Sequence, residues 1–350
     1  MTGTNGKSTT TRLLAAATGT LGSTAYSAHG SNMAAGITVA LARAPRAPYA
    51  ALEVDEAFLV PVATELQPTV IVLLNLSRES TRGNLLAAIT AGWEEGFRNA
   101  AARPDVFVAN ADDPLVVSVV PDDAPVRWVS DGGGWARDTE VCPRCHGPIR
   151  RRPGDWECTD CPLRRPAPDW TLTDTGLTGP DRQSSRLDLA LPGAWTRSNA
   201  AFAIAAAVEL GAEVPAAVAA VAAVTDVDGR YRPFSIDGRS VRLVMVKNAA
   251  SWTAATTVGG TDPVVLAVEP FGLKDTSPLW EADLDALTGR PVVVTGQRAP
   301  DAALRLATSG IAHTVVEDPL TAIRSAPPGP VWVIANYTAF LDLKHALDAD

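Results

Sequence analysis

The stretch T-G-T-N-G-K-S-T close to the N-terminus constrains the fold of this chain more than any other feature. Loops of this composition bind phosphate where a β-strand ends and a helix begins, because the loop amides and the helix N-terminus then face the anion. Gly3 and Gly6 permit close approach of the backbone, and Lys7 can reach the outer phosphates of a nucleotide. Ser8 or Thr9 can place a hydroxyl on Mg²⁺. The motif is shorter than the general G-x-x-x-x-G-K-[ST] pattern, and its alternative is an ordinary glycine-rich turn.

Strand-like and helical runs alternate behind this loop. Residues 8–22 and 84–101 read as helices, whereas residues 49–54, 69–76 and 105–110 read as short, apolar strands. This alternation predicts an α/β fold with a mostly parallel sheet that helices cover on both faces.

A cluster of turn residues, T-D-V-D-G-R at 225–230, separates two such patterns. We therefore expect a first domain at 1–225 and a second, smaller α/β domain at 226–350. Two further helical runs, 198–211 and 215–224, precede the boundary. The expected strands of the second domain are a hairpin at 232–246 and single strands at 263–270, 291–297, 312–318 and 330–336.

The four cysteines form the most specific motif. They stand in C-P-R-C and C-T-D-C with twelve residues between the pairs, a spacing that closes a tetrahedral thiolate site. Disulfide pairs are the alternative, but we expect structural zinc, with His146 as a bystander. Four protein ligands leave no open coordination position, so the metal should stabilise rather than catalyse. The site would lie in an inserted module at about 131–168, with Cys142, Cys145, Cys158 and Cys161 as ligands.

The net charge of −9 and the pI near 5.0 argue against binding to nucleic acid or, by charge alone, to anionic lipid. No stretch approaches the roughly 18 consecutive apolar residues of a membrane span. We expect a cytoplasmic protein.

Two polar clusters follow predicted strands. In L-E-V-D-E-A-F, the period of a strand puts Glu53 and Asp55 on one face, where a carboxylate could hold Mg²⁺; a solvated acidic loop that includes Glu56 is an equal alternative. In N-A-D-D-P at 110–114, the favoured interpretation is that Asn110 and the aspartates cap the next helix.

Taken in order, five segments resemble the Mur ligase family: T-G-T-N-G-K-S-T, L-E-V-D-E-A, P-T-V-I-V-L-L-N-L, N-A-D-D-P and L-P-G-A-W-T-R-S-N-A-A-F-A-I-A-A-A. The four-cysteine insert and the later D-G-R-Y, V-K-N and N-Y-T-A-F stretches resemble the branch of that family that amidates lipid II. The resemblance covers nearly the whole chain. It implies a central phosphate-loop domain with an inserted zinc ribbon, followed by a smaller α/β C-terminal domain.

The resemblance implies an ATP-dependent carbon–nitrogen ligase that forms isoglutamine in the lipid II stem peptide. ATP would phosphorylate the α-carboxylate of D-glutamate, and ammonia would displace the phosphate of the acyl phosphate. The ammonia would come from a GatD-type glutaminase in a heterodimer, since this chain has no cysteine beyond the four in the insert. The implied cofactors are ATP, Mg²⁺ and Zn²⁺, and lipid II would bring the protein to the inner face of the membrane.

The resemblance also implies the residues of the site. Nucleotide contacts would come from Gly3, Thr4, Asn5, Gly6, Lys7, Ser8, Thr9, Asn110, Asn199, Arg230 and Lys247. Arg230, Lys247 and Asn248 would face the nucleotide or substrate across a cleft between the domains. Ser8 and Glu53 would bind magnesium, and the catalytic set would be Lys7, Glu53, Asp275 and Glu281, with Asp283 as a further candidate facing the glutaminase.

The chain departs from the family pattern in places. It has K-N-A-A-S for K-N-P-A-G, Pro278 for a tryptophan, Glu281 for an aspartate, and no strand before the loop. We therefore expect Met1 to be free and flexible, and either the natural start to lie upstream or ATP binding to be weakened. The alternatives are a catalytically weakened scaffold or regulatory paralogue, a Mur-type amino-acid ligase, and a plain α/β protein with a zinc ribbon.

Overall fold

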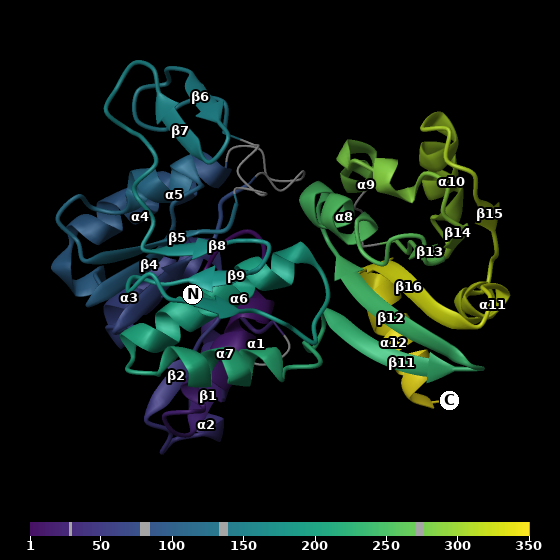
Figure 1. Cartoon of the computed structure of the whole chain (residues 1–350), viewed down its shortest axis with the longest axis horizontal. Coiled ribbons are helices and arrows are strands. Elements are labelled where there is room, and N and C mark those ends of the chain that lie inside the picture. The colour runs from purple at the N-terminus through teal and green to yellow at the C-terminus, as the bar shows by residue number, and fades with distance from the viewer. Residues whose placement is uncertain (28–29, 78–84, 133–138, 271–275, 350) are drawn as a thin grey trace. The chain divides into compact units, whose positions relative to one another are not determined.

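The computed structural model describes residues 1–27, 30–77, 85–132, 139–270 and 276–349. The chain divides into two compact units, Met1–Val224 and Thr225–Asp350 (Figure 1). Each is described by itself.

Helices and strands alternate through most of the first unit, as expected. Its helices are α1 (Lys7–Thr18), α2 (Ala34–Arg43), α3 (Leu59–Leu66), α4 (Leu85–Arg98), α5 (Pro114–Val119), α6 (Ala194–Glu209) and α7 (Val214–Ala222). Its strands are β1 (Thr24–Tyr26), β2 (Tyr49–Ala51), β3 (Val70–Leu73), β4 (Val106–Asn110), β5 (Val126–Ser130), β6 (Ile149–Arg152), β7 (Asp155–Cys158), β8 (Trp170–Leu172), β9 (Gly176–Thr178) and β10 (Ser184–Arg186).

Six of the described strands form the main sheet of this unit, in the order β10-β9-β8-β5-β4-β3. From β3 to β8 the neighbours are parallel, and β9 and β10 extend the sheet in antiparallel fashion. Side chains of α3, α4 and α5 pack with those of β3 and β4 in one apolar core, which includes the fully buried Phe97 and Phe107. Helices α1 and α6 pack together, and α6 contacts β3, β4, β5 and β8. The parallel strands thus lie covered between helices, which confirms the expected fold class.

Met1 and Thr2 take the place of a strand beside β3, so the expectation of a free, flexible Met1 is wrong. The Thr2 N–H donates to the Val72 carbonyl at 3.0 Å, and the Leu74 N–H donates to the Thr2 carbonyl at 3.1 Å. On the other side, the Val54 N–H donates to the Met1 carbonyl at 3.0 Å. Thr2 is fully buried. These two residues therefore connect the parallel β1–β2 pair to the main sheet and brace the phosphate loop from the strand side.

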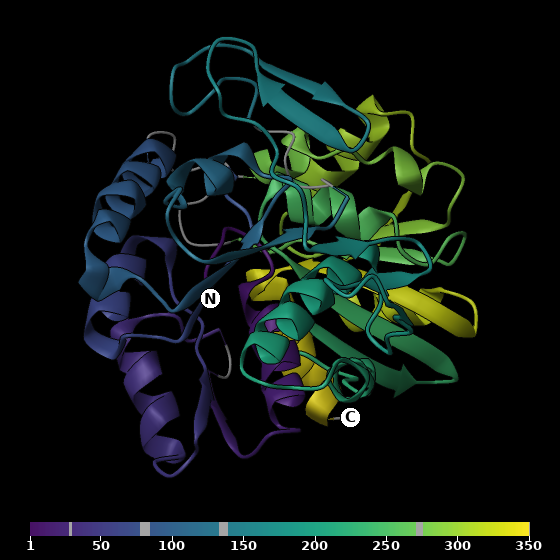
Figure 2. The same ribbon diagram turned by 60° about the vertical axis from the view of Figure 1, so that its left-hand side comes forward.

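The four-cysteine insert is a small substructure built around the antiparallel β6–β7 hairpin. In Figure 2 this hairpin stands away from the main sheet. Its own core contains Trp156, Leu163, Cys142 and Cys158, and it packs against Val117 of α5. The insert is therefore anchored on α5.

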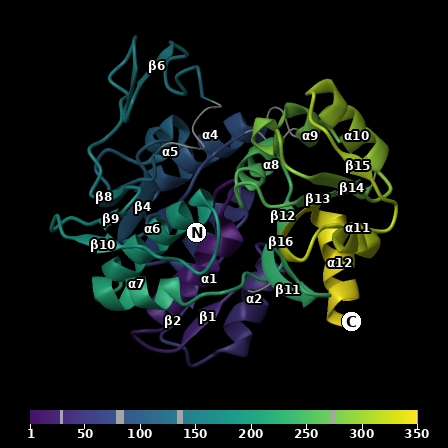
Figure 3. The same cartoon turned by 45° about the vertical axis from the view of Figure 1, so that its right-hand side comes forward.

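The second unit is also a covered sheet, with described strands in the order β11-β12-β16-β13-β14-β15. The β11–β12 hairpin is antiparallel, and the remaining neighbours are parallel. Helices α11 and α12 pack on one face, while α8 and α10 lie on the other (Figure 3). Its strands are β11 (Tyr231–Ile236), β12 (Arg239–Val246), β13 (Val264–Ala267), β14 (Val292–Thr295), β15 (Thr314–Val315) and β16 (Gly329–Asn336), and its helices are α8 (Ala249–Thr256), α9 (Ser277–Glu281), α10 (Ala299–Thr308), α11 (Pro319–Ser325) and α12 (Tyr337–Ala349).

Candidate nucleotide and metal sites

The phosphate loop lies between the edge of β3 and the start of α1, and Asn75 fixes its shape. The Asn5 N–H donates to Asn75 Oδ1 at 3.0 Å, and Asn75 Nδ2 donates to the Asn5 carbonyl at 3.0 Å. The Thr4 N–H donates to the Asn75 carbonyl at 2.8 Å, and the Ser77 N–H donates to Thr4 Oγ1 at 3.0 Å. Asn75 was not singled out from the sequence. Because its side-chain amide pairs with both backbone groups of Asn5, the middle of the loop is held by the chain itself.

Both loop glycines are required by geometry. Gly3 has a φ of +145°, and a Cβ there would lie 2.9 Å from Asn75 backbone atoms. Gly6 has a φ of +89°, and its Cβ would lie 2.3 Å from Asn199 Oδ1. L side chains rarely adopt such φ values, and neither position has room for one. The Asn199 side chain, on α6, thus lies directly against the loop at Gly6.

Lys7 is held by Glu56, a carboxylate that the strand period did not favour. Its Nζ donates to the Gly3 carbonyl at 2.6 Å and to the two carboxylate oxygens of Glu56 at 3.0 and 3.1 Å. Both side chains are largely buried, with exposed fractions of 8% for Lys7 and 12% for Glu56. A bound phosphate would compete with Glu56 for this ammonium group.

Two other buried polar atoms have the chemistry of a magnesium site. Ser8 Oγ at the start of α1 and Glu53 Oε2 after β2 have no hydrogen-bond partner among the described residues. Glu53 is 1% exposed. A hydroxyl and a carboxylate oxygen are ligands that Mg²⁺ accepts, and bonding to a cation would satisfy either orphaned atom. Asp55, the alternative carboxylate, instead caps the short 3₁₀ turn Glu56–Phe58 by accepting the Ala57 N–H at 3.1 Å.

Asn110 lies at the end of β4, and both polar atoms of its side-chain amide form hydrogen bonds within the protein. Its Nδ2 donates to the Leu74 carbonyl at 2.8 Å, and its Oδ1 accepts the Asp112 N–H at 2.8 Å. The side chain therefore ties the end of β4 to the end of β3 and shapes the turn that follows.

Asp113 caps α5, which confirms the capping interpretation for this residue of the N-A-D-D-P segment, whereas the side chain of Asp112 bonds to Arg165 and residues 130–132. One carboxylate oxygen accepts the Leu115 N–H at 2.9 Å, and the other accepts the Leu76 N–H at 2.7 Å. Burial of the carboxyl group outweighs these bonds and raises the pKa of Asp113 to about 6.

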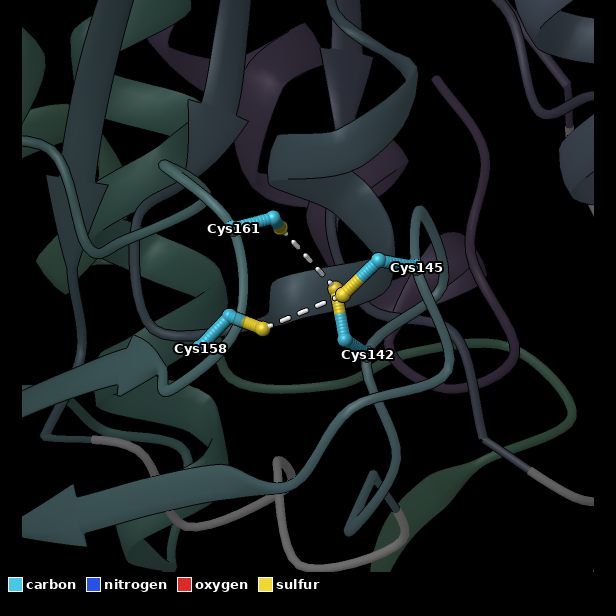
Figure 4. A group of neighbouring side chains, drawn as sticks. All are labelled: Cys142, Cys145, Cys158 and Cys161. Carbon is cyan, nitrogen blue, oxygen red and sulfur yellow. Dashed lines mark hydrogen bonds between the residues drawn. The ribbon is translucent and has the colours of Figure 1, made fainter.

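The four cysteines converge, as Figure 4 shows. All four Sγ atoms lie within 4.8 Å of one another; the Cys142–Cys161 pair is 3.6 Å apart and the Cys145–Cys158 pair 3.4 Å. These distances exceed the length of a disulfide bond, and all four residues are free cysteines. Sulfurs around a tetrahedral zinc ion are about 3.8 Å apart, given Zn–S bonds near 2.3 Å. The cluster therefore fits a four-thiolate metal site.

Backbone amides support the thiolates of this cluster. The Gly147 N–H points to Cys145 Sγ and the Asp160 N–H to Cys158 Sγ, each at 3.4 Å. His146 is exposed, and its N–H donates to the Cys142 carbonyl at 2.9 Å. Its ring is not part of the four-residue ligand group found among the described residues.

In the second unit, Arg230 and Lys247 lie towards the same end of β12. The Met245 N–H donates to the Arg230 carbonyl at 2.8 Å, and Lys247 follows two residues later with an exposed side chain. Asn248 caps α8 by accepting the Ser251 N–H at 3.0 Å.

The candidate acids of this unit differ in their surroundings. Glu281 ends α9 and is exposed, whereas Asp283 caps the following turn by accepting the Asp285 N–H at 2.9 Å. Asp275 lies outside the described residues.

In the part of the chain that the structure describes, no helix has both the length and the apolar character to cross a bilayer.

Comparison with known proteins relates both units to ligases of peptidoglycan synthesis. Residues 1–121 match the Mur ligase middle domain, and residues 264–340 match the MurT ligase C-terminal domain. The MurT subunit of lipid II isoglutaminyl synthase (glutamine-hydrolyzing) from Streptococcus pneumoniae is 26% identical over 99% of this chain and 86% of its own length. The subunit of the same name from Staphylococcus aureus strain COL is 23% identical over the same shares.

Solved structures share the fold at lower identity. MurF from Acinetobacter baumannii superposes with a TM-score of 0.70 at 18% identity, over 100% of this chain and 76% of that one. MurF ligase from Thermotoga maritima, solved in complex with ADP, gives a TM-score of 0.64 at 16% identity, over 100% of this chain and 79% of that one. The chain therefore resembles MurT subunits along almost its whole length, with a region that matches the Mur ligase middle domain followed by a region that matches the MurT ligase C-terminal domain.

Proposed function

We propose that this chain is the ligase subunit of a two-subunit amidotransferase that converts the α-carboxylate of D-glutamate in the lipid II stem peptide to an amide. The observation that carries the proposal is the phosphate loop. It presents the buried Lys7 and the buried Ser8, whose Oγ has no hydrogen-bond partner among the described residues, and Glu53 Oε2 after β2 is likewise buried and unpartnered. The likeness to MurT along almost the whole chain supports the choice of reaction.

ATP is bound by the loop between Gly3 and Ser8, with the backbone amides and Lys7 facing the phosphates. Lys7 leaves Glu56 and moves to the transferred phosphoryl group, whose negative charge it offsets. Ser8 and Glu53 would hold Mg²⁺, which would supply positive charge to neutralise the phosphates. Asn199 lies against Gly6 and limits the loop to one shape on that side.

The carboxylate of the substrate attacks the γ-phosphorus, ADP leaves, and an acyl phosphate forms. A carboxylate is a poor electrophile because its own leaving group would be an oxide ion, and phosphorylation supplies a good one. Ammonia then attacks the carbonyl carbon, loses a proton, and expels inorganic phosphate.

The ammonia source is a second subunit, a glutaminase of the GatD type. All four cysteines of this chain lie in the cluster, so none remains to act as a glutaminase nucleophile. Arg230, Lys247 and Asn248 are the residues of the second unit that we assign to nucleotide or substrate, and Asp275 and Glu281 to the side facing the glutaminase.

The proposal is tested with the purified pair of this chain and the glutaminase, lipid II, MgATP and glutamine. We expect ADP, glutamate and amidated lipid II in equal amounts, and hydroxylamine should trap the acyl phosphate as a hydroxamate when glutamine is omitted. ATP turnover that requires a free amino acid and ignores ammonia would identify an amino-acid ligase instead. Absence of ATP turnover under every condition would instead support the alternative of a scaffold without catalytic activity.

A further inference from the structure

We propose that the four-cysteine insert braces the nucleotide site, with Arg165 and Trp156 as positioning residues that set the affinity for ATP. This inference rests on the proposed function, because it concerns the turn Asn110–Asp113, which is hydrogen-bonded to the end of β3 beside the phosphate loop that we assign to ATP. The insert would then do more than stabilise itself. Its metal-held core would fix one wall of the site.

Two side chains of the insert reach the turn directly. Arg165 Nε donates to Asp112 Oδ1 at 2.6 Å, and its Nη2 donates to Ser130 Oγ at 2.8 Å. The exposed fractions of these side chains are 14% for Arg165 and 8% for Asp112, so solvent screens the pair little. Trp156 Nε1 donates to the Ala111 carbonyl at 3.0 Å, and this indole is buried in the core of the insert.

The insert holds these two residues in a fixed relation. The Arg165 N–H donates to the Trp156 carbonyl at 2.9 Å, which pairs the two across the end of β7. Trp156 is packed with Cys142 and Cys158 in one core, and Cys158 ends β7 itself. Binding of a metal by the four thiolates would therefore set the position of both side chains.

A first route leads from the turn to the phosphate loop through the ends of two strands. Asn110 donates to the Leu74 carbonyl at 2.8 Å, and Asp113 accepts the Leu76 N–H at 2.7 Å. Leu74 and Leu76 flank Asn75, the residue whose amide and carbonyl fix the loop. Each step is a hydrogen bond to the backbone, so a displaced turn would displace the loop.

A second route runs through α6. Asp112 Oδ2 accepts the Asp131 N–H at 2.9 Å, and the Asp131 carboxylate accepts a hydrogen bond from Ser198 Oγ. Ser198 is followed by Asn199, whose side chain lies against Gly6. Asp112 therefore stands where the contacts of the insert and both routes to the loop meet.

The proposal is tested with Arg165→Ala and a matched control, Arg152→Ala, in the full chain. Arg152 lies on β6 of the same insert with an exposed side chain, 3.6 Å from Glu157. Calorimetry with MgATP should show roughly tenfold weaker binding for Arg165→Ala and unchanged binding for the control. In the glutaminase complex, the KM for ATP should rise while kcat stays near the wild-type value. Asp112 keeps its bonds from residues 130–132, so the variant should remain folded and retain its metal.

A second variant and a second readout separate this inference from the proposed function. Trp156→Phe removes the bond to Ala111 and keeps an aromatic ring in the core, and it should also weaken ATP binding. Hydrogen exchange without nucleotide should become faster in residues 110–118 of both variants and not in the control. Unchanged exchange there, or wild-type affinity in both variants, would overturn the inference. If the wild-type protein binds no ATP, the proposed function fails, and the claim about affinity fails with it.

Discussion

Gly6→Ala is the substitution whose effect follows most directly from the geometry of the loop. The φ of +89° at Gly6 costs a residue with a side chain about 1–2 kcal/mol. The new methyl carbon would also lie 2.3 Å from Asn199 Oδ1, about 1 Å inside an ordinary contact. Asn199 is 6% exposed and cannot move into solvent. Overpacking of this kind costs about 1–3 kcal/mol, so the free energy of unfolding should fall by roughly 2–5 kcal/mol in all.

Gly211→Ala is the matched control. Gly211 has a φ of +101° at the end of α6, and a Cβ there would meet nothing within 4 Å. The free energy of unfolding of Gly211→Ala should therefore fall only by the cost of a positive φ, about 1–2 kcal/mol. For a unit of this size each kcal/mol lowers the Tm by about 2–4 °C, so thermal unfolding should rank wild type, Gly211→Ala and Gly6→Ala in that order.

A double-mutant cycle tests whether the contact with Asn199 causes the extra loss of stability in Gly6→Ala. Asn199→Ala removes the oxygen that the new methyl group would meet, so the combination with Gly6→Ala should recover most of the overpacking cost. MgATP binding should be weakened in Gly6→Ala and unchanged in Gly211→Ala. Equal losses of stability in the two glycine variants would refute the argument, because they would leave no cost for the contact with Asn199.

Three further predictions concern other parts of the first unit. Lys7→Met should lower the free energy of unfolding by about 3 kcal/mol because Glu56 is left buried and unpaired; adding Glu56→Gln should restore stability in denaturant titrations while ATP turnover stays absent. Cys158→Ser should reduce the metal content from about one zinc per chain to near zero by mass spectrometry, whereas His146→Ala should retain it, and a metal-free wild type purified under reducing conditions would contradict the assignment. Because burial raises the pKa of Asp113 to about 6, its ionisation opposes folding, and the contribution of this carboxyl group to the stability of the wild type should fall as the pH rises from about 4 to about 6. This part of the pH dependence should be missing from Asp113→Asn, and identical pH profiles for the two proteins would show that the carboxyl group is not perturbed.

The alternation of apolar runs was sufficient to predict the fold class. The parallel strands β3 and β4 read as short apolar runs because both of their faces are covered, and α4 between them has the period of a helix. The spacing of the cysteines likewise predicted their convergence, since two C-x-x-C pairs at this separation are typical of the four ligands of one metal ion. By contrast, β8, β9 and β10 were not predicted, because three-residue strands such as Ser184–Arg186 carry too few apolar positions to show a period.

The side chains that pair with one another in the site could not be predicted from the sequence. Strand periodicity favoured Glu53 and Asp55 over Glu56, yet a 3₁₀ turn after β2 directs Glu56 to Lys7. The bond between Arg165 and Asp112 joins residues 53 positions apart, and only the folded insert brings them together. The error at Met1 has a similar cause: pairing with residues around 54 and 73 replaces the strand that local sequence does not show.

The measurement that tests the account most directly is calorimetric titration of the intact, zinc-loaded chain with ATP and magnesium, beside the Lys7→Met, Glu56→Gln double variant. The account predicts one binding site per chain in the wild type, dependence of that binding on magnesium, and none in the folded double variant. Binding of equal strength in both proteins would place the nucleotide away from this loop. No binding in the wild type would remove the ligase mechanism altogether.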